Sequence, residues 1–305
     1  MLGALLGVAS AMVFAVSNTF LRRGVLKASS GYVANITIFT GLALFIVITG
    51  VTGGLSQLGQ YSWRVYALFA IQGIVHFALG RTFAYRSVQL LGVVRSQVPT
   101  NLNVVVTIVL ALILFRETVT PRMVVGIALC VLGPILLSAR EPVQHRSLMT
   151  NTDHKKVDRR TLSKGIFFGL GTALFWGGST ILVKLALNEG GTPIFGNLIA
   201  YLAASIVISP SVFAGTQSRK EIFSTRKGIF LLALFCGLAT SIAHILRYFA
   251  LEYGSVIVVS LMYQTGPLWV MLLAFIFNRN YESFSRWALL GNGAITVGVV
   301  LILLP

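Results

Sequence analysis

The sequence is poor in charged residues and poorest in acids. Only 10% of its 305 residues are charged, whereas an ordinary globular chain carries about 25%. Asp and Glu together number 8, against 24 Lys and Arg. So few charged residues cannot provide the hydrated surface of a water-soluble protein of this length, which excludes a soluble fold.

Several chemical signatures are also missing. Every acid falls in a loop or near the end of an apolar tract, so none lies deep enough to bind a cationic drug. The sequence has no Walker A motif for ATP, no H-E-x-x-H and no G-x-S-x-G. The 2 cysteines, Cys130 and Cys236, lie in apolar tracts and are interpreted as small core residues. We expect no catalytic residue, metal or cofactor, and no enzyme activity.

What the sequence does have is long uncharged tracts. A helix crosses the hydrocarbon core with about 20 apolar residues, and most of the tracts reach that length. The tract from Val65 reaches it only if the helix runs on through Arg81 to about Tyr85. The tracts are Met1–Leu21, Ala28–Trp63, Val65–Gly80, Ser96–Phe115, Met123–Ala139, Gly165–Val183, Gly190–Ser218, Gly228–Leu246, Tyr253–Asn278 and Trp287–Pro305. They predict an all-α polytopic membrane protein with ten transmembrane helices.

Basic residues are distributed unequally between alternate loops. With ten crossings, one side receives most of the Lys and Arg, including those of the central loop, and the other receives only Arg64, Arg116 and Arg122. The positive-inside rule makes the basic side cytoplasmic. We therefore expect a cytoplasmic (inner) membrane protein with external termini and a cytoplasmic central loop. The net charge of +16 is interpreted as topology-setting charge facing membrane lipids, not as a nucleic-acid surface.

The two halves of the chain repeat each other at an offset that drifts by only a few residues. Residues 1–138 and 165–305 each hold five predicted crossings and flank a polar loop, 139–164. Because five is odd, the second half is inserted upside down, which is typical of secondary transporters with a solute site near the membrane midplane. The matched pairs are Phe14 with Phe175, Thr19 with Thr180, Asn35 with Asn197, Arg81 with Arg247, Pro99 with Pro267, Gly126 with Gly291, and Gly133 with Gly298.

These repeats resemble the EamA type of the drug/metabolite transporter (DMT) superfamily. The first half carries Gly80-Arg81, Gly92-Val-Val-Arg95, Pro99, Phe115-Arg116-Glu117-Thr118-Val119-Thr120 and Gly126 to Gly133; the second carries Phe175-Trp176-Gly177, Phe249-Ala250-Leu-Glu-Tyr-Gly254, Pro267 and Gly291 to Gly298. The resemblance implies two inverted five-helix repeats around a central cavity that transports a small metabolite. It does not name the substrate.

Two positions depart from the pattern. The acid usual after the fourth helix of a repeat is present as Glu117, but Asn280 replaces it in the second repeat. The aromatic residue Trp176, which opens the second repeat, has only Ala15 at the matching place of the first.

Ionisable side chains within predicted spans are candidate site residues, because burying a charge in lipid is costly. Arg81 and Arg247 occupy mirror-related depths, and His76 and His244 lie nearer the midplane on the same helices. Thr240, His244 and Arg247 share one helix face. The arginines either line a cavity or extend to headgroups and helix-end carbonyls. If protons are coupled to transport, the two histidines are the titrating candidates within the spans.

Polar segments around two prolines are further candidates. Pro99 removes a backbone donor and leaves carbonyls that a solute or water can satisfy, and the segment around Pro267 brings amide, phenol and indole groups to the symmetry-related place. Trp176 is interpreted either as cavity lining or as an interfacial or core aromatic. The remaining candidates of this class are Arg95, Gln97 and Asn101 in the first half, Tyr263, Gln264 and Trp269 in the second, and Asn18 in the first helix.

The predicted cavity carries a neutral to positive charge. This charge favours a small organic anion or zwitterion, such as an amino acid, as the solute of a secondary transporter that works by alternating access. The alternatives are a broad exporter of neutral metabolites, or a lipid flippase or accessory membrane subunit. The expected partners are a small-molecule solute and membrane lipids, without nucleic acid, and the expected assembly is a monomer or homodimer.

Overall fold

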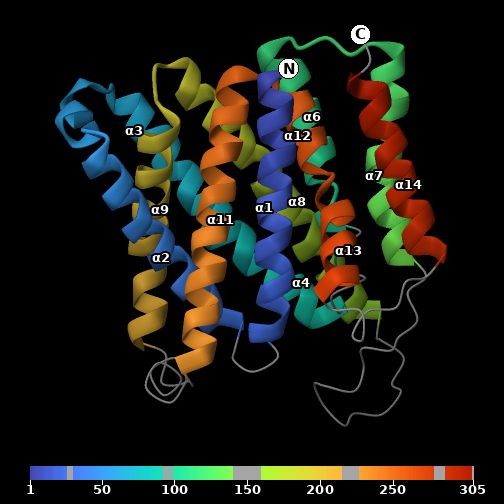
Figure 1. Cartoon of the computed structure of the whole chain (residues 1–305), viewed down its shortest axis with the longest axis horizontal. Helices are drawn as coiled ribbons and strands as arrows, with labels where there is room; N and C mark the ends of the chain where they lie inside the picture. Colours follow the sequence, from blue (N-terminus) through green and yellow to red (C-terminus); the bar gives the residue numbers. More distant parts are fainter. Residues whose placement is uncertain are drawn as a thin grey trace. The chain divides into compact units, whose positions relative to one another are not determined.

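The computed structural model describes residues 1–25, 30–91, 96, 99–139, 159–214, 227–277 and 286–303. Within these ranges every regular element is helical and no strand is present (Figure 1). This follows from the composition, because in lipid a helix satisfies its own backbone hydrogen bonds. The all-α membrane fold predicted from the sequence is confirmed.

Each predicted tract coincides with one helix or with consecutive helical segments. The elements of the first half are α1 Leu2–Val25, α2 Ser30–Val51, η1 Gly54–Gln60, α3 Trp63–Gly73, η2 Ile74–Gly80, α4 Arg81–Leu91, α6 Asn103–Phe115 and α7 Pro121–Ala139. Those of the second half are α8 Arg159–Asn188, α9 Pro193–Ala214, α11 Lys227–Tyr253, α12 Val256–Tyr263, α13 Gly266–Phe277 and α14 Arg286–Leu303.

Among the described residues, 6 helices are long and apolar enough to cross a membrane. The count is up to 7 if the bent pair formed by α2 and η1 is one span; the two segments meet at 86°, where Gly53 adopts a φ of 73° that favours glycine. The chain is therefore a multi-pass membrane protein. The number of ten crossings stays a prediction.

The third tract continues through Arg81, as its length requires. α3, η2 and α4 follow one another without a gap, and a single candidate span runs from Trp63 to Val88. The middle segment, η2, is π-helical. Because π-helical turns interrupt the regular α-helical ladder and recur at functional sites, this segment marks the part of the span that carries His76.

The second end of the predicted central loop, 139–164, is helical. α8 begins at Arg159, so residues 159–164 form its first turns. The length of an uncharged tract indicates where a helix enters the lipid, but it does not indicate where the helix begins. Arg and Lys are good helix formers, and the exposed first turns of α8 extend beyond the apolar tract.

The described residues form two compact units. Unit 1 comprises Met1–Ala78 and Ser179–Asn278, and unit 2 comprises Leu79–Gly178 and Arg279–Pro305. Each unit takes segments from both halves of the sequence. A division by spatial contacts therefore differs from the division into sequence repeats.

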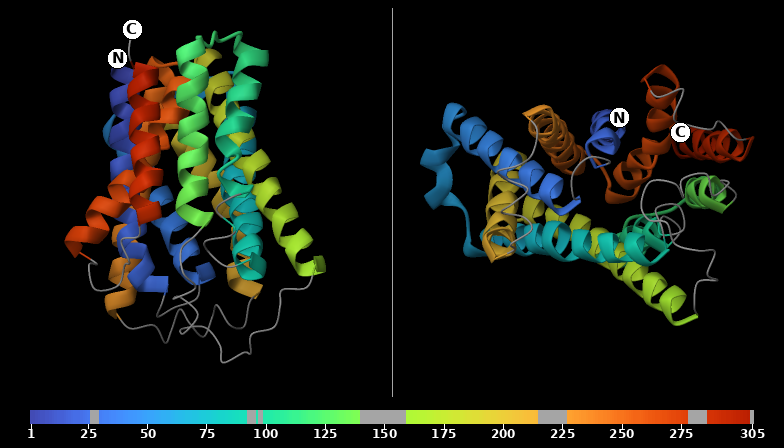
Figure 2. Two further views of the ribbon diagram at one scale, coloured as in Figure 1. Left: turned by 90° about the vertical axis from the view of Figure 1, so that its right-hand side faces the viewer. Right: turned by 90° about the horizontal axis from the view of Figure 1, so that it is seen from below.

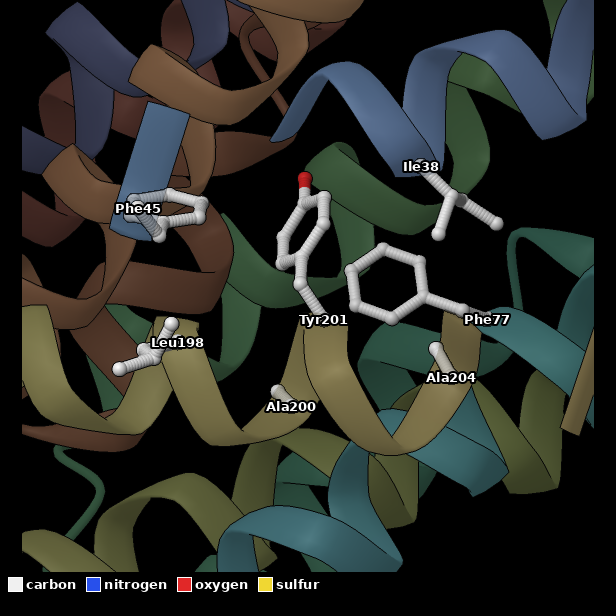
Figure 3. Close-up of a cluster of buried hydrophobic side chains, with 7 residues drawn as sticks. All are labelled: Ile38, Phe45, Phe77, Leu198, Ala200, Tyr201 and Ala204. Carbon is white, nitrogen blue, oxygen red and sulfur yellow. The ribbon is translucent and has the colours of Figure 1, made fainter. Parts of the chain in front are cut away.

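In unit 1, α11 packs against α1 and α2, and α9 packs against α2 and α3 (Figure 1). The core between these helices is a cluster of buried side chains in which the Tyr201 ring stands between Phe45 and Phe77 (Figure 3). The other members are Ile38, Leu198, Ala200 and Ala204. Gly73 allows α3 to reach the backbone of α9, because a Cβ there would collide with the Ala200 carbonyl.

In unit 2, α7 and α14 lie side by side (Figure 2). A Cβ on Gly126 would lie 2.8 Å from the Gly298 carbonyl oxygen, and one on Gly133 would lie 2.7 Å from that of Gly291. The first glycine of one helix thus faces the second glycine of the other, so the helices run antiparallel. Since these glycines are equivalent in the two repeats, this arrangement is the one that an inverted repeat requires.

Candidate functional site

Polar side chains follow one face of α11 in the middle of an apolar span. Thr240, His244 and Arg247 are spaced by four and three residues, which places them on the same side of the helix. The hydroxyl of Thr240 lies 2.7 Å from that of Ser17 on α1. His244 is buried and Arg247 is half-buried. This face of α11 therefore meets other helices of unit 1.

Two histidines from different elements lie next to each other on this face. The ring centroids of His76 and His244 are 5.6 Å apart and their planes are inclined by 89°. His76 Nδ1 is 2.9 Å from the Ser179 hydroxyl on α8. The His244 ring also contacts Phe77 and Phe14, at 5.2 and 6.4 Å between centroids. The pair thus contacts aromatic side chains, with a hydroxyl beside His76; His244 is buried and His76 is half-buried.

The second imidazole has its own hydroxyl partner. His244 Nδ1 lies 2.6 Å from the Tyr201 hydroxyl, and Ser241 Oγ lies 3.4 Å from the same phenol oxygen. Ser241 also donates to the Gly237 carbonyl at 2.8 Å. Tyr201 belongs to the packed core of Figure 3, which holds its ring in place. The histidine is therefore the end of a chain of hydroxyl groups.

Arg247 is held by a hydroxyl and an aromatic face. Its Nη2 donates to Thr180 Oγ1 at 2.7 Å, and its Cζ lies 4.7 Å from the centroid of the Tyr263 ring. Cation–π contacts of this kind orient a guanidinium without neutralising it. In the described part of the chain, no carboxylate forms an ion pair with Arg247.

These contacts join three elements, because Thr180 directly follows Ser179 on α8. α8 contacts His76 of η2 through one hydroxyl and Arg247 of α11 through the next. We call His76, Ser179, Thr180, His244 and Arg247 the histidine–arginine cluster. Its two histidines and its arginine are unusual in a lipid-spanning region, where ionisable groups face one another or a polar cavity.

Lys184, one turn beyond Thr180 on α8, has a different environment. Its Nζ donates to the Leu251 carbonyl at 2.7 Å and to the Gly254 carbonyl at 3.2 Å. These carbonyls belong to the last turn of α11 and the residue after it, where the final C=O groups lack intrahelical donors. Lys184 therefore caps α11.

The predicted tract Tyr253–Asn278 is interrupted before Pro267, and Pro267 itself lies in the first turn of a helix. α12 ends at Tyr263 and α13 begins at Gly266, so Pro267 occupies a first-turn position where its missing N–H costs little. Gln264 lies in the break, and its buried Nε2 has no hydrogen-bond partner among the described residues. Trp269 Nε1 donates to Thr265 at 3.2 Å.

The structure brings together four of the predicted site residues: His76, His244, Arg247 and Tyr263. Asn18 is exposed on α1. Three more belong to unit 2 and are half-buried: Arg81, Asn101 and Trp176. Arg95 and Gln97 lie outside the described residues.

Three members of the arrangement were not predicted as site residues. Ser179, Thr180 and Tyr201 supply the hydroxyl groups that contact the ionisable side chains. The signal for the first two was a consecutive Ser-Thr pair in the middle of an apolar tract, after two glycines. Tyr201 gave a weaker one, as a single phenol within the tract Gly190–Ser218.

Chemically, the cluster suits the binding of an anionic group. A guanidinium with one donor on a hydroxyl keeps the remaining N–H groups for a carboxylate. The cluster has no arrangement of nucleophile, base and orienting acid. The described residues include no group of three or more side chains that could hold a metal ion.

Comparison with known proteins identifies the family. The EamA-like transporter family matches residues 1–139 and again residues 163–304. Among solved structures 28 chains match, and one, described as a crystal structure of a protein, has a TM-score of 0.74. It is 14% identical, and the alignment covers 99% of this chain and 96% of that one, which is a likeness of fold. No curated protein matches. Because the family matches nearly the whole chain in two segments, the chain belongs to the EamA-like transporter family of the DMT superfamily.

Proposed function

We propose that this transporter is a secondary carrier of a small organic anion or zwitterion, such as an amino acid, and that Arg247 binds the solute's carboxylate. The carrier works in the cytoplasmic membrane, with external termini and alternating access between the repeats. The observation that carries the proposal is the environment of Arg247, a half-buried cation with no carboxylate partner among the described residues.

The contacts of Arg247 favour binding over a purely structural role. A structural cation in a span normally contacts a carboxylate or backbone carbonyls, as Lys184 does with Leu251 and Gly254. Arg247 contacts a hydroxyl and an aromatic face instead. This environment fixes the orientation of the guanidinium and leaves its charge for a ligand. An anionic group also gains from the scarcity of acids in the spans, because it meets no repulsion there.

The experiment measures binding to purified wild-type protein and to Arg247→Gln and Arg247→Lys. The probes are a panel of radiolabelled carboxylic and amino acids, each paired with its own amide. Losing a charge-assisted contact weakens acid binding by about 1.5–3 kcal/mol, or about 10- to 150-fold. The Lys variant restores only part of the affinity, because an ammonium cannot form a bidentate fork. Amide analogues bind weakly to all three proteins.

The matched control is Arg64→Gln. The Arg64 side chain is 64% exposed and approaches Glu189 at 4.0 Å, so its loss leaves affinity unchanged. Thermal unfolding is measured on the same samples. Normal acid binding by a less stable Arg247→Gln protein would show that the arginine is structural and would leave the exporter of neutral metabolites as the better function.

A further inference from the structure

We propose that His76 and His244 together hold one proton, and that this proton binds jointly with the carboxylate at Arg247. The protein is then a proton–anion symporter. The inference rests on the proposed function, because the bound anion supplies the charge that balances the proton. It adds a second ligand, the proton, and assigns it a site 5.6 Å across between two imidazole rings.

The first argument is that the partners of His244 suit both of its protonation states. When the ring is neutral, the Tyr201 phenol donates to Nδ1 across 2.6 Å. When Nδ1 carries a proton, the ring donates to the phenol oxygen, and the phenol hydrogen turns to Ser241 Oγ at 3.4 Å. Ser241 can accept it because its own hydrogen is directed to the Gly237 carbonyl. The Nδ1 atom of His244 therefore has a hydroxyl partner in both protonation states.

His76 has the same kind of partner. A serine hydroxyl both donates and accepts, so Ser179 can donate to a neutral Nδ1 or accept from a protonated one at 2.9 Å. A backbone carbonyl would fix the nitrogen as a donor, and a backbone N–H would fix it as an acceptor. The described Nδ1 partners of His76 and His244 are hydroxyl groups. This choice of partners is what a titrating imidazole needs.

The second argument limits the pair to one proton. Two unit charges 5.6 Å apart repel enough, at an effective dielectric constant of about 20, to separate the two proton-binding steps by about two pH units. Arg247 adds further repulsion, since it lies three residues from His244 on the same helix face. The second histidine therefore stays neutral once the first is protonated.

The third argument concerns the groups that face the pair. Besides the histidines, the ionisable side chains in the parts of the surrounding elements nearest the pair are Arg247 and Tyr248 on α11, Tyr201 on α9, Tyr263 on α12 and Lys184 on α8, whereas the other charged residues of α8 and α11 lie toward the helix ends. None of these is negative at neutral pH. Glu252, the described acid of α11, lies eight residues beyond His244, or about 12 Å along the helix. Among the described residues of these elements, no acid lies close enough along the helix to balance an added proton.

A carboxylate bound at Arg247 changes this balance. It offsets the guanidinium and attracts the proton, so anion and proton favour each other's binding. Because such coupling is reciprocal, the anion increases proton uptake by the pair, and the proton increases affinity for the anion. The consequence is the joint movement of one proton with one carboxylate, so that a proton gradient drives solute uptake.

The test follows the imidazole signals of the full-length protein by NMR in phosphatidylcholine nanodiscs. His145 and His154 are replaced by Gln, so that His76 and His244 give the only histidine signals. Spectra are recorded from pH 8 to pH 5 in sodium acetate or in acetamide with sodium chloride at equal ionic strength. We expect the pair to take up one proton in total. In acetate the midpoint lies about one pH unit higher, the effect of an opposite charge roughly 10 Å away.

Each outcome decides something different. Two independent protons, or none down to pH 5, would overturn the shared site. A midpoint that is the same in acetate and acetamide would overturn joint binding. Arg247→Gln should abolish the acetate effect; if the variant keeps that effect, the pair and its coupling stand, but the proposed role of Arg247 fails. The two proposals are thereby separated, and the wild-type measurement does not depend on the folding of any histidine variant of the pair.

Discussion

At the scale of single residues, the two cations of unit 1 show how much environment decides the role of a charge. Lys184 donates to two carbonyls at the end of α11, where a positive charge also complements the helix dipole. Arg247 contacts a hydroxyl and an aromatic ring. The donors of the Lys184 ammonium are occupied by backbone carbonyls, whereas the Arg247 guanidinium has N–H groups that a ligand could bind. We therefore assign a role in stability to Lys184, and the binding role proposed for Arg247 is consistent with this difference.

Lys184→Met tests this assignment. Removing the ammonium leaves two carbonyls without a donor, which destabilises the protein by about 1–3 kcal/mol without weakening acid binding. Lys164→Met is the control, because Lys164 lies on the same helix and is exposed. Thermal unfolding in detergent gives the stability of both variants. Equal melting temperatures for the two would contradict the capping role.

The sequence predicted the ionisable members of the cluster but not their partners. His76, His244 and Arg247 were singled out because a charge in lipid requires an explanation. Ser and Thr carry no such signal, since most satisfy themselves within their own helix, as Thr19 does with the carbonyl of Ala15. Whether Ser179 binds a histidine depends on which helix packs beside it, and sequence spacing does not contain that information.

At the scale of helices, local interruptions were the part that sequence reasoning described least well. The π-helical segment η2 has no proline to announce it, and it directly follows Gly73, where α3 approaches α9. Such a turn depends on tertiary packing and not on local propensity. Pro267 was identified as the counterpart of Pro99, yet neither the break before it nor its position in the first turn of α13 was predicted.

The close contact of α7 and α14 gives a prediction at this scale. Gly298→Ala places a Cβ 2.7 Å from the Gly126 carbonyl oxygen, and this overpacking lowers stability by about 1–3 kcal/mol. Gly293→Ala, on the same helix, meets no atom within 4 Å and gains helix propensity instead. Thermal unfolding of the two variants compares them. A Gly298→Ala protein as stable as Gly293→Ala would disprove the close packing.

At the scale of the whole molecule, every described helix overlaps a predicted apolar tract when the third tract is extended to about Tyr85, while the two compact units were not predicted. The length of an apolar tract reflects the thickness of the hydrocarbon core, which constrains each helix separately. The units take segments from both halves, because Phe77 of the first half packs with Tyr201 and His244 of the second. Contacts between residues that are distant in the sequence cannot be predicted from the hydropathy of each segment.

Orientation in the membrane gives the last prediction. Cysteine at Ser56, in η1, should react with an impermeant maleimide in intact cells, because we expect the η1 region to be external. Cysteine at Ser147, in the central loop, should react only after permeabilisation, because Lys and Arg keep that loop cytoplasmic. The native Cys130 and Cys236 are buried, so they add little background. Labelling of the Ser147 variant in intact cells would reverse the assigned topology.

The glycine contacts between α7 and α14 also bear on how the chain arose. Each helix offers the same pair of glycines to the other, so the contact is self-complementary: one half-length copy could have made it with a second, oppositely inserted copy of itself. Fusion of two such copies would preserve the contact while allowing the halves to diverge elsewhere. The histidine–arginine cluster then records that divergence, since it combines Arg247 and His244 of one half with His76 of the other.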